Sequence, residues 1–295
     1  MPRILVAGKT GQLGWELQSA LLPLGRVLVL DRAQMDFASA DSIREALRTH
    51  KPDVIVNAAG YTSVDKAEAE AARVHQVNAI APGIIAEEAK RLNALMIHYS
   101  TDYVYDGMKG APYTEDDAPN PLNTYGRSKL AGEQAITAVG CAHLILRASW
   151  IYSDRGSNFV LLALKLARER ETVAMVADQV GSPCWARSLA SSTAQLLACM
   201  QDRRDVSGVY HFSAVNHTTR YDFADKIIEL ARAHRAAGTR WAALTRTTTA
   251  NYPLPAARPL NVATSKEKIR RDFGIIMPSW QEQIEAYIPV SAALI

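Results

Sequence analysis

The stretch Ala7-Gly8-Lys9-Thr10-Gly11-Gln12-Leu13-Gly14 decides the expected fold, because it joins a short apolar run to a helix-like segment. The run Ile4–Ala7 is typical of a buried strand, and the residues after the turn have the apolar period of a helix. Gly8 would let the chain leave the strand tightly, Gly11 would admit close backbone approach, and Gly14 would let the helix pack closely. A strand, a glycine turn and a helix in this order predict the start of an α/β unit.

The acidic residue Asp31 ends the next apolar run, Val27–Leu30, and stands 20 positions after Gly11. A carboxylate there binds ribose hydroxyls in dinucleotide-binding folds, while the helix N-terminus offers free N–H groups to phosphates. The turn therefore predicts a dinucleotide site. Arg32 follows directly, so a carboxylate suited to NAD stands beside an arginine that can accept the 2′-phosphate of NADP. This pair leaves the choice between the two cofactors open.

Strand-like and helix-like segments alternate through the first 150 residues, which is typical of a parallel sheet covered on both faces. The expected strands are 4–7, 27–30, 54–56, 95–99 and 144–148; the expected helices are 13–22, 42–50, 67–91 with a break near Pro82, and 125–139. Further on we expect helices over 159–170, 186–200 and 221–234, a strand over 208–213, an extended segment over 245–259 and a last helix from about 279.

This order of elements predicts an α/β fold with a doubly wound parallel Rossmann sheet. We expect an NAD(P)-binding domain over residues 1–150 and a smaller C-terminal α/β substrate-binding lobe over 151–295. The boundary is approximate, and segments of the two parts can interleave.

Composition excludes several classes of protein. The chain has 295 residues, 48% of them hydrophobic, and a net charge of +3 without a long block of one sign, which argues against a nucleic-acid binder. The basic stretch 266–271 fits a solvated helix face. Three cysteines without a Cys-x-x-Cys pair indicate a reducing cytoplasm rather than a disulfide or zinc scaffold. No apolar run approaches the roughly 20 residues of a membrane span.

A tyrosine and a lysine stand four residues apart in Tyr125-Gly126-Arg127-Ser128-Lys129. On a helix these two side chains share a face, so the ammonium could lower the pKa of the phenol and make Tyr125 a proton donor to a carbonyl. Such pairs also occur by chance on helix surfaces. Two expected strand ends add weight, because ligands bind at the carboxyl ends of parallel strands. Hydroxyl groups gather in Tyr99–Tyr103, and small residues follow the third strand in Asn57–Thr62.

The chain resembles the extended short-chain dehydrogenase/reductase superfamily and, within it, the dTDP-4-dehydrorhamnose reductase family. The motifs that carry the narrower resemblance are Gly8-Lys-Thr-Gly-Gln-Leu-Gly-Trp-Glu-Leu17, Val64-Asp-Lys-Ala-Glu68, His98-Tyr-Ser-Thr-Asp-Tyr-Val104, Tyr125-Gly126 with Lys129-Leu-Ala-Gly-Glu133, Arg147-Ala-Ser-Trp150, Asn158-Phe159 and Asp178-Gln179. The resemblance covers nearly the whole chain.

The resemblance implies reduction of the C4 keto group of dTDP-4-dehydro-6-deoxy-L-mannose by NADPH, with NADH also plausible, to give dTDP-L-rhamnose. Tyr125 would protonate the developing alkoxide, Lys129 would tune Tyr125 and hold the nicotinamide ribose, and Thr101 would position the carbonyl. Thr101, Asp102 and Trp150 are the implied substrate contacts. The implied cofactor contacts are Gly8, Gly11, Gln12, Leu13, Asp31, Arg32, Asp36, Phe37, Ala59, Gly60, Tyr61, Thr62, Tyr99, Tyr125 and Lys129.

Some residues have plainer interpretations, and these stay open. Trp150 could simply pack at a strand end, Asp36 could be a turn carboxylate, and His98 is expected to be a satisfied interior residue. Some members of the family form dimers bridged by magnesium through carboxylates, and Glu16 matches one of these. The other ligand positions fall near Arg187 and Val290, whose side chains cannot hold a hard cation. We therefore expect no metal and a monomer or weak homodimer.

Two other functions compete with the reductase. An epimerase or dehydratase of the same superfamily would turn over without net use of reduced cofactor. A non-catalytic cofactor-binding regulatory subunit would not need Thr101, Tyr125 and Lys129 together, so their joint presence favours an enzyme.

Overall fold

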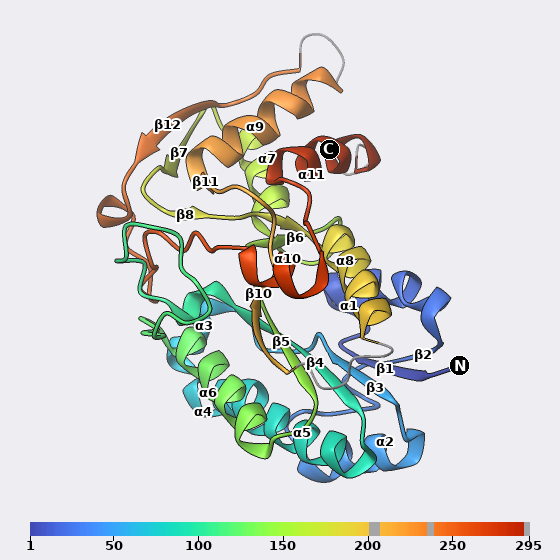
Figure 1. The fold of residues 1–295 in the computed structure, drawn as a ribbon. Coiled ribbons are helices and arrows are strands. Elements are labelled where there is room, and N and C mark those ends of the chain that lie inside the picture. The colour runs from blue at the N-terminus through green and yellow to red at the C-terminus, as the bar shows by residue number, and fades with distance from the viewer. Residues whose placement is uncertain (201–206, 235–238, 292–295) are drawn as a thin grey trace.

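The computed structural model describes residues 1–200, 207–234 and 239–291. Its centre is a six-stranded parallel sheet in the order β10-β5-β4-β3-β1-β2, as Figure 1 shows. These strands are β1 (Arg3–Ala7), β2 (Arg26–Leu30), β3 (Val54–Asn57), β4 (Leu95–Thr101), β5 (His143–Ala148) and β10 (Gly208–His211). The chain runs outward from β1 to β2 and then crosses to β3 on the other side. The order therefore reverses beside β1, where open α/β sheets bind ligands.

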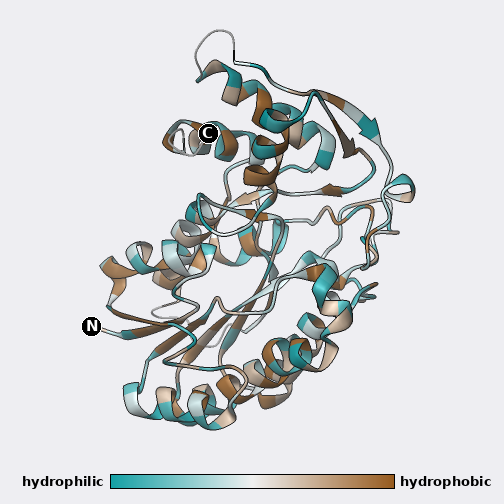
Figure 2. Ribbon diagram, turned by 180° about the vertical axis from the view of Figure 1, so that it is seen from behind, coloured by the Kyte–Doolittle hydropathy of each residue, from teal (hydrophilic) through white to brown (hydrophobic). Residues whose placement is uncertain are grey.

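Helices cover both faces of this sheet, which confirms the α/β class. The helices of the first half are α1 (Gln12–Ala20), η1 (Leu22–Leu24), α2 (Ala40–His50), α3 (Val64–Ala69), α4 (Ala71–His75), η2 (Gln76–Ile80), α5 (Ala81–Leu92), η3 (Asp102–Val104) and α6 (Thr124–Val139). Helix α1 packs with α8 (Ala186–Cys199) on one face, whereas α2, α5 and α6 lie on the other. β3 and β4 are buried along their whole length, and the sheet strands are largely in the brown of apolar residues in Figure 2.

The later residues form a second group of elements above the sheet in Figure 1. Besides α8, they are β6 (Ile151–Tyr152), α7 (Phe159–Glu169), β7 (Thr172–Val176), β8 (Val180–Gly181), β9 (Cys184–Trp185), β11 (Thr218–Thr219), α9 (Arg220–Ala233), β12 (Ala243–Thr247), η4 (Thr249–Asn251), α10 (Glu267–Phe273) and α11 (Trp280–Val290). The strands here pair only two by two. β10 comes from this half of the chain, so the main sheet extends past residue 150; the domain division itself stays a prediction.

One long expected helix is wrong in detail. The segment 67–91 breaks at Glu70, between α3 and α4, and not near Pro82. Pro82 lies in the first turn of α5, directly after η2, and the chain stays helical through it. Between α4 and α5 the helix widens into the π-helical turn η2, a feature that often marks functional sites.

Among the described residues, no helix is both long enough and apolar enough to cross a bilayer.

Candidate active site

A cavity of about 590 Å³ lies at the carboxyl ends of the central strands. All residues that the sequence predicted for catalysis, cofactor or substrate contribute to its lining: Gly8, Gly11, Gln12, Leu13, Asp31, Arg32, Asp36, Phe37, Ala59, Gly60, Tyr61, Thr62, Tyr99, Thr101, Asp102, Tyr125, Lys129 and Trp150. The parallel sheet brings them together because every one of its strands ends at the same edge. Their individual roles stay proposals.

The glycine turn has the geometry that its spacing predicted. Gly8 has a φ of 106°, which favours glycine, and its N–H donates to the Leu30 carbonyl at 3.0 Å. A Cβ on Gly14 would lie 2.0 Å from the Gly8 carbonyl oxygen, so Gly14 keeps α1 close to the turn itself rather than to the sheet. Gly11 is the N-cap of α1 and offers no side-chain cap, and such a helix N-terminus suits a phosphate.

Asp31 and Arg32 lie directly after β2, as expected of the ribose end of a dinucleotide site. The Asp31 Oδ1 atom accepts from the N–H groups of Ala33 and Gln34 at 3.0 and 3.2 Å. Arg32 Nε lies 3.4 Å from Asp36 Oδ1, and both side chains are substantially exposed. Asp36 Oδ1 also accepts from a nearby backbone N–H, so this carboxylate serves the turn as well. Arg32 must leave a weak surface ion pair to meet a 2′-phosphate.

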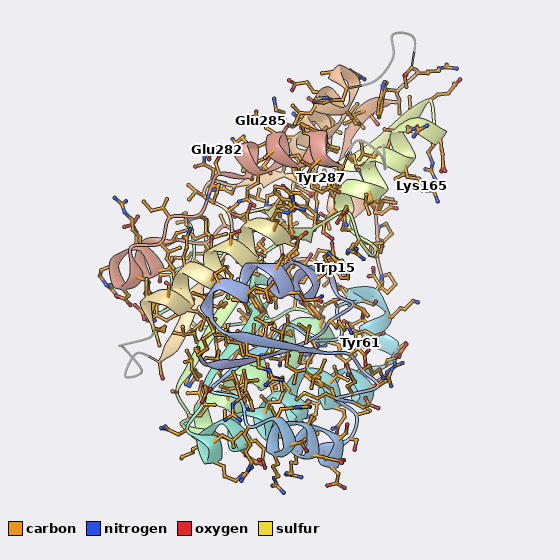
Figure 3. All side chains as sticks on the ribbon, turned by 90° about the vertical axis from the view of Figure 1, so that its right-hand side faces the viewer. Trp15, Tyr61, Lys165, Glu282, Glu285 and Tyr287 are labelled. Carbon is orange, nitrogen blue, oxygen red and sulfur yellow. The ribbon has the colours of Figure 1, made fainter. Side chains whose placement is uncertain are left out.

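The loop after β3 is held by Asn78, a residue that the sequence did not single out. Its Oδ1 accepts from the Tyr61 N–H at 2.8 Å, and its Nδ2 donates to the Tyr61 carbonyl and to Ser128 Oγ at 3.0 Å each. Asn78 reaches this loop from the π-helical turn η2. Figure 3 shows Tyr61 on the same side of the molecule as Trp15 of α1. No local sequence signal marks Asn78, because its role depends on how α6 packs against η2.

Tyr125 lies in the first turn of α6, whose N-cap is Asn123. A Cβ on Gly126 would meet the Tyr103 carbonyl oxygen at 2.3 Å, so glycine there lets α6 lie against η3 at the end of β4. The Tyr125 hydroxyl is hydrogen-bonded to Thr101. The Thr101 hydroxyl also accepts from the Tyr103 N–H at 3.1 Å and contacts Asp102 Oδ1 at 3.3 Å. The expected Tyr125–Thr101 pair is therefore assembled.

The structure gives Lys129 other partners than Tyr125, so its expected effect on the pKa of Tyr125 stays a prediction. Burial raises the pKa of Tyr125 above its usual value, although the Thr101 hydrogen bond opposes the rise. Lys129 Nζ instead donates to the Tyr99 carbonyl at 2.6 Å and lies 3.1 Å from His98 Nε2. Burial also lowers the pKa of Lys129 to about 8. Residues four apart share a helix face, but the long lysine side chain can reach other partners, which here are His98 and Tyr99 on β4.

Besides lining the cavity, Tyr99 connects two elements of the fold. Its hydroxyl is hydrogen-bonded to Thr193 on α8, and its side chain is buried, which raises the pKa of the phenol. The phenol therefore joins β4 to α8. The backbone carbonyl of Tyr99 accepts a hydrogen bond from Lys129 Nζ.

Asp102 is a buried carboxyl group beside Thr101. Burial raises its pKa to about 6, while hydrogen bonds from Ser149 and Thr101 and the charge of Arg220 lower it. Ser149 donates to Oδ2. The site thus holds a carboxyl group whose charge changes near neutral pH.

Trp150 is held in an unusual backbone conformation, with a φ of 37°. Its indole lies beside Gly181, where an added Cβ would be 2.5 Å from Cε2. The Arg220 guanidinium lies 3.5 Å from the centroid of a Trp150 ring and also contacts Phe159. Arg220 opens α9 and lines the cavity, although it was not among the site residues predicted from the sequence. Ser149 is likewise a lining residue that was not predicted on its own.

Glu16, considered above as a metal ligand, forms an ion pair with Arg187, with Nε 3.2 Å from Oε2. Within the described ranges there is no group of three or more His, Cys, Asp or Glu side chains arranged to hold a metal.

Known proteins are similar to this chain in both sequence and fold. The family model of the RmlD substrate binding domain matches residues 2–292. The dTDP-4-dehydrorhamnose reductase of Escherichia coli (strain K12) is 44% identical over 284 residues, which cover 94% of each chain. This chain belongs to the dTDP-4-dehydrorhamnose reductase family. A second member of the family, from Burkholderia thailandensis, is 43% identical and covers 95% of each chain.

A solved structure of the family extends the likeness to three dimensions. The dTDP-4-dehydrorhamnose reductase of Bacillus anthracis, in complex with NADP, superposes with a TM-score of 0.90 at 31% identity, covering 98% of this chain and 99% of that one. The UDP-glucose 4-epimerase of Thermus thermophilus has a TM-score of 0.82 at 18% identity, with 99% and 100% covered. At that identity the epimerase shares only the fold, which confirms the Rossmann-type sheet.

Proposed function

We propose that this chain reduces the C4 keto group of dTDP-4-dehydro-6-deoxy-L-mannose with NADPH to give dTDP-L-rhamnose, the last step of dTDP-rhamnose biosynthesis. The observation that carries the proposal is that Thr101, Tyr125 and Lys129 line the same cavity as the glycine turn. The family to which the chain belongs supplies the substrate, since its curated relatives are reductases of this name.

The lining fits a nicotinamide dinucleotide. A Cβ on Gly8 would lie only 3.0 Å from the backbone of Ala58, so glycine lets the turn pack closely against the chain after β3. The uncapped N-terminus of α1 would hold the pyrophosphate, and Asp31 or Arg32 would bind the adenosine ribose or its 2′-phosphate. When bound, the cofactor supplies a hydride. NADPH is our first choice because Arg32 can pair with a phosphate, and NADH is plausible because Asp31 stands beside it.

The chain's own residues would handle the proton. Thr101 holds the substrate carbonyl oxygen next to the Tyr125 hydroxyl, and Tyr125 gives its proton to that oxygen as negative charge develops. The raised pKa of Tyr125 keeps the phenol protonated in the free site, which is the form that a proton donor needs. Asp102 and Trp150 would contact the sugar on the side of β5, and Lys129 would hold the nicotinamide ribose.

The surroundings of the enzyme follow from the same proposal. A dTDP-sugar is the small-molecule partner, and neither a nucleic acid nor a membrane is needed. We propose a cytoplasmic enzyme that acts as a monomer or weak homodimer. The Glu16–Arg187 ion pair supports a metal-free surface, because an arginine occupies the carboxylate that a cation would need.

The test follows absorbance at the reduced-nicotinamide band. The purified chain receives NADPH, then NADH, with the keto sugar generated in place from dTDP-glucose by the upstream enzymes. We expect oxidation that depends on this chain, faster with NADPH, and dTDP-L-rhamnose as product. No oxidation, with the intermediate confirmed present and cofactor bound, would contradict the proposal and favour an epimerase or a regulatory subunit.

A further inference from the structure

Behind Lys129 lies a buried chain of polar side chains that the proposed reaction does not use. Asn57 ends β3 and His98 lies in β4, and the two are paired across the sheet. Asn57 Nδ2 lies 3.0 Å from His98 Nδ1, and Lys129 Nζ lies 3.1 Å from His98 Nε2. Asn57 and His98 are both 0% exposed, so each polar atom must find its partner within the protein.

The donors and acceptors fix which nitrogen of His98 carries the proton. The Ala59 N–H donates to Asn57 Oδ1 at 3.1 Å, which turns Asn57 Nδ2, a donor, toward His98. His98 Nδ1 must therefore accept. A neutral imidazole has one N–H, so this proton lies on Nε2 and points at Lys129 Nζ.

Two effects keep His98 neutral. Burial lowers its pKa well below 6.5, whatever the charge of Lys129, and the charge of His143 lowers it further. With His98 neutral and its Nε2 protonated, Lys129 can complete the contact only by accepting a hydrogen bond through the lone pair of an amine. An ammonium would set two N–H donors against each other, whereas the amine still donates to the Tyr99 carbonyl at 2.6 Å.

The charged groups around Lys129 do not override this arrangement. Burial lowers the pKa of Lys129 to about 8, and Glu133 on α6 is the group that raises it. Glu133 is itself bound by Arg147 on β5, with Nη2 2.6 Å from Oε2. The positive charge of Arg147 therefore largely neutralises the negative charge of Glu133. His143, also on β5, lowers the pKa of His98 and so favours the neutral imidazole.

We propose that Asn57 and His98 are positioning residues for Lys129: they present an imidazole N–H to Nζ and so favour its amine form, which accepts that hydrogen bond. This role deepens the proposed reductase and rests on it only for its use in turnover. A lysine of ordinary pKa would stay an ammonium at every working pH. A lysine poised near neutral pH can take up and return a proton beside Tyr125 during each cycle.

The primary test needs no substrate. Nitrogen-15 NMR of the histidine rings, with His143→Asn and His211→Asn used to assign the three histidines that are buried among the described residues, reports which nitrogen carries the proton. In the free wild-type protein at about pH 9 we expect His98 Nε2 to show the shift of a protonated nitrogen and Nδ1 that of an acceptor. The reverse pattern would overturn the proposal.

A second test reverses the tautomer. In Asn57→Asp a carboxylate oxygen accepts from Nδ1–H, which leaves Nε2 as an acceptor for a Lys129 ammonium. We expect the Lys129 Nζ titration, followed by NMR, and the alkaline limb of kcat/KM to move up by about one pH unit or more. Asn57→Leu removes the amide without adding charge and should shift both in the same direction.

The outcomes separate the two proposals. If the tautomer reverses while the Lys129 titration stays in place, the positioning role is wrong. If the ring and lysine results are as expected but the chain does not oxidise NADPH with the keto sugar, the reductase proposal fails and the effect of His98 on Lys129 stands.

Discussion

Asp102 is a cavity residue whose charged form is disfavoured by burial. Its usual pKa of 3.8 rises to about 6 because burial disfavours the carboxylate. Between these two values the folded protein binds a proton that the unfolded chain has already released. Stability from this group is therefore complete below about pH 4 and is lost as the pH rises through about 6.

Asp102→Asn should remove this pH dependence. Between pH 4 and pH 7, we expect the free energy of unfolding of the wild type to fall relative to that of the variant by about 1–3 kcal/mol, since one pH unit of pKa shift corresponds to about 1.4 kcal/mol. Urea unfolding at pH 4, 5, 6 and 7 measures the difference. A constant difference across that range would show that Asp102 ionises normally in the folded protein.

Tyr125→Phe should reduce turnover by about 10²-fold or more and leave cofactor affinity nearly intact, as expected for loss of a general acid. Stopped-time assays of NADPH oxidation and fluorescence titration with NADPH measure the two effects. Tyr210→Phe is the matched control, because its hydroxyl bonds to Asp272 and lies outside the cavity lining. Near-normal turnover of the Tyr125 variant would remove that residue from the mechanism.

Arg32→Ala should weaken binding of NADPH more than binding of NADH, because it removes a charge-assisted contact to the 2′-phosphate. In the free protein Arg32 pairs with Asp36 on the surface, so little stability is lost with it. Dissociation constants for both cofactors provide the comparison, with Arg44→Ala on α2 as a charge-matched control. Equal weakening of the two cofactors would mean that Arg32 does not recognise the phosphate.

Among single residues, the sequence predicted most of the site residues that follow strands and missed two that helix packing brings to the site. Asp31, Thr101 and the Asn57–Thr62 loop were found because parallel strands end at one edge, whatever the details of the fold. Asn78 and Arg220 come from helices whose approach depends on the assembled core. The sequence could not predict the protonation state of Lys129 either, because that state depends on a contact between α6 and His98 on β4.

At the scale of elements, the packing of α6 against η2 positions part of the cavity lining. Gly132 makes it possible, because a Cβ there would lie 2.1 Å from the Asn78 carbonyl oxygen. Asn78 in turn holds the Tyr61 loop, so this close approach connects helix packing to the cofactor side of the cavity. The π-helical turn lets Asn78 face both α6 and the loop.

Gly132→Ala should destabilise the protein by about 1–3 kcal/mol, because overpacking outweighs the better helix propensity of alanine. It should also weaken NADPH binding by loosening the Tyr61 loop. Gly83→Ala on α5 is the control, since its Cβ would meet only the side chain of Ala135 at 3.2 Å. Urea midpoints and cofactor affinities that match between the two variants would show that the contact at Asn78 has no special effect.

The periodicity of the sequence located the long elements and failed for the short ones. The strands and helices of the sheet lie within a few residues of their expected positions because each has enough residues to show its apolar period. The strands β6, β8, β9 and β11 have two residues each and carry no such signal. The break at Glu70 was misplaced because proline was taken as a helix breaker, although the chain stays helical through Pro82.

Across the whole molecule, the two halves of the chain share one hydrophobic core. A single cluster of buried side chains includes Ile4 and Leu17 from the first half and Leu189, Phe223 and Ile284 from the second. β10 completes the main sheet by pairing with β5. We therefore expect the proposed domains to fold together rather than independently.

Urea unfolding should accordingly follow one transition when monitored by far-ultraviolet circular dichroism and by tryptophan fluorescence, which reports mostly on the second half of the chain. A fragment of residues 1–150 should lack a cooperative transition, because it loses β10 and the packing of α8 on α1. Two separated transitions in the full chain, or a stable fragment, would contradict a shared core.

The proposed function depends above all on hydride transfer to C4 of the keto sugar. To follow that hydride, the chain is supplied with NADPH that carries deuterium at C4 of the nicotinamide, and the product is examined by NMR and mass spectrometry. We predict dTDP-L-rhamnose with one deuterium at C4 of the sugar and an equal amount of oxidised cofactor. Turnover of the sugar without deuterium at C4 and without consumption of NADPH would contradict the proposed reduction and indicate internal redox exchange of the epimerase kind.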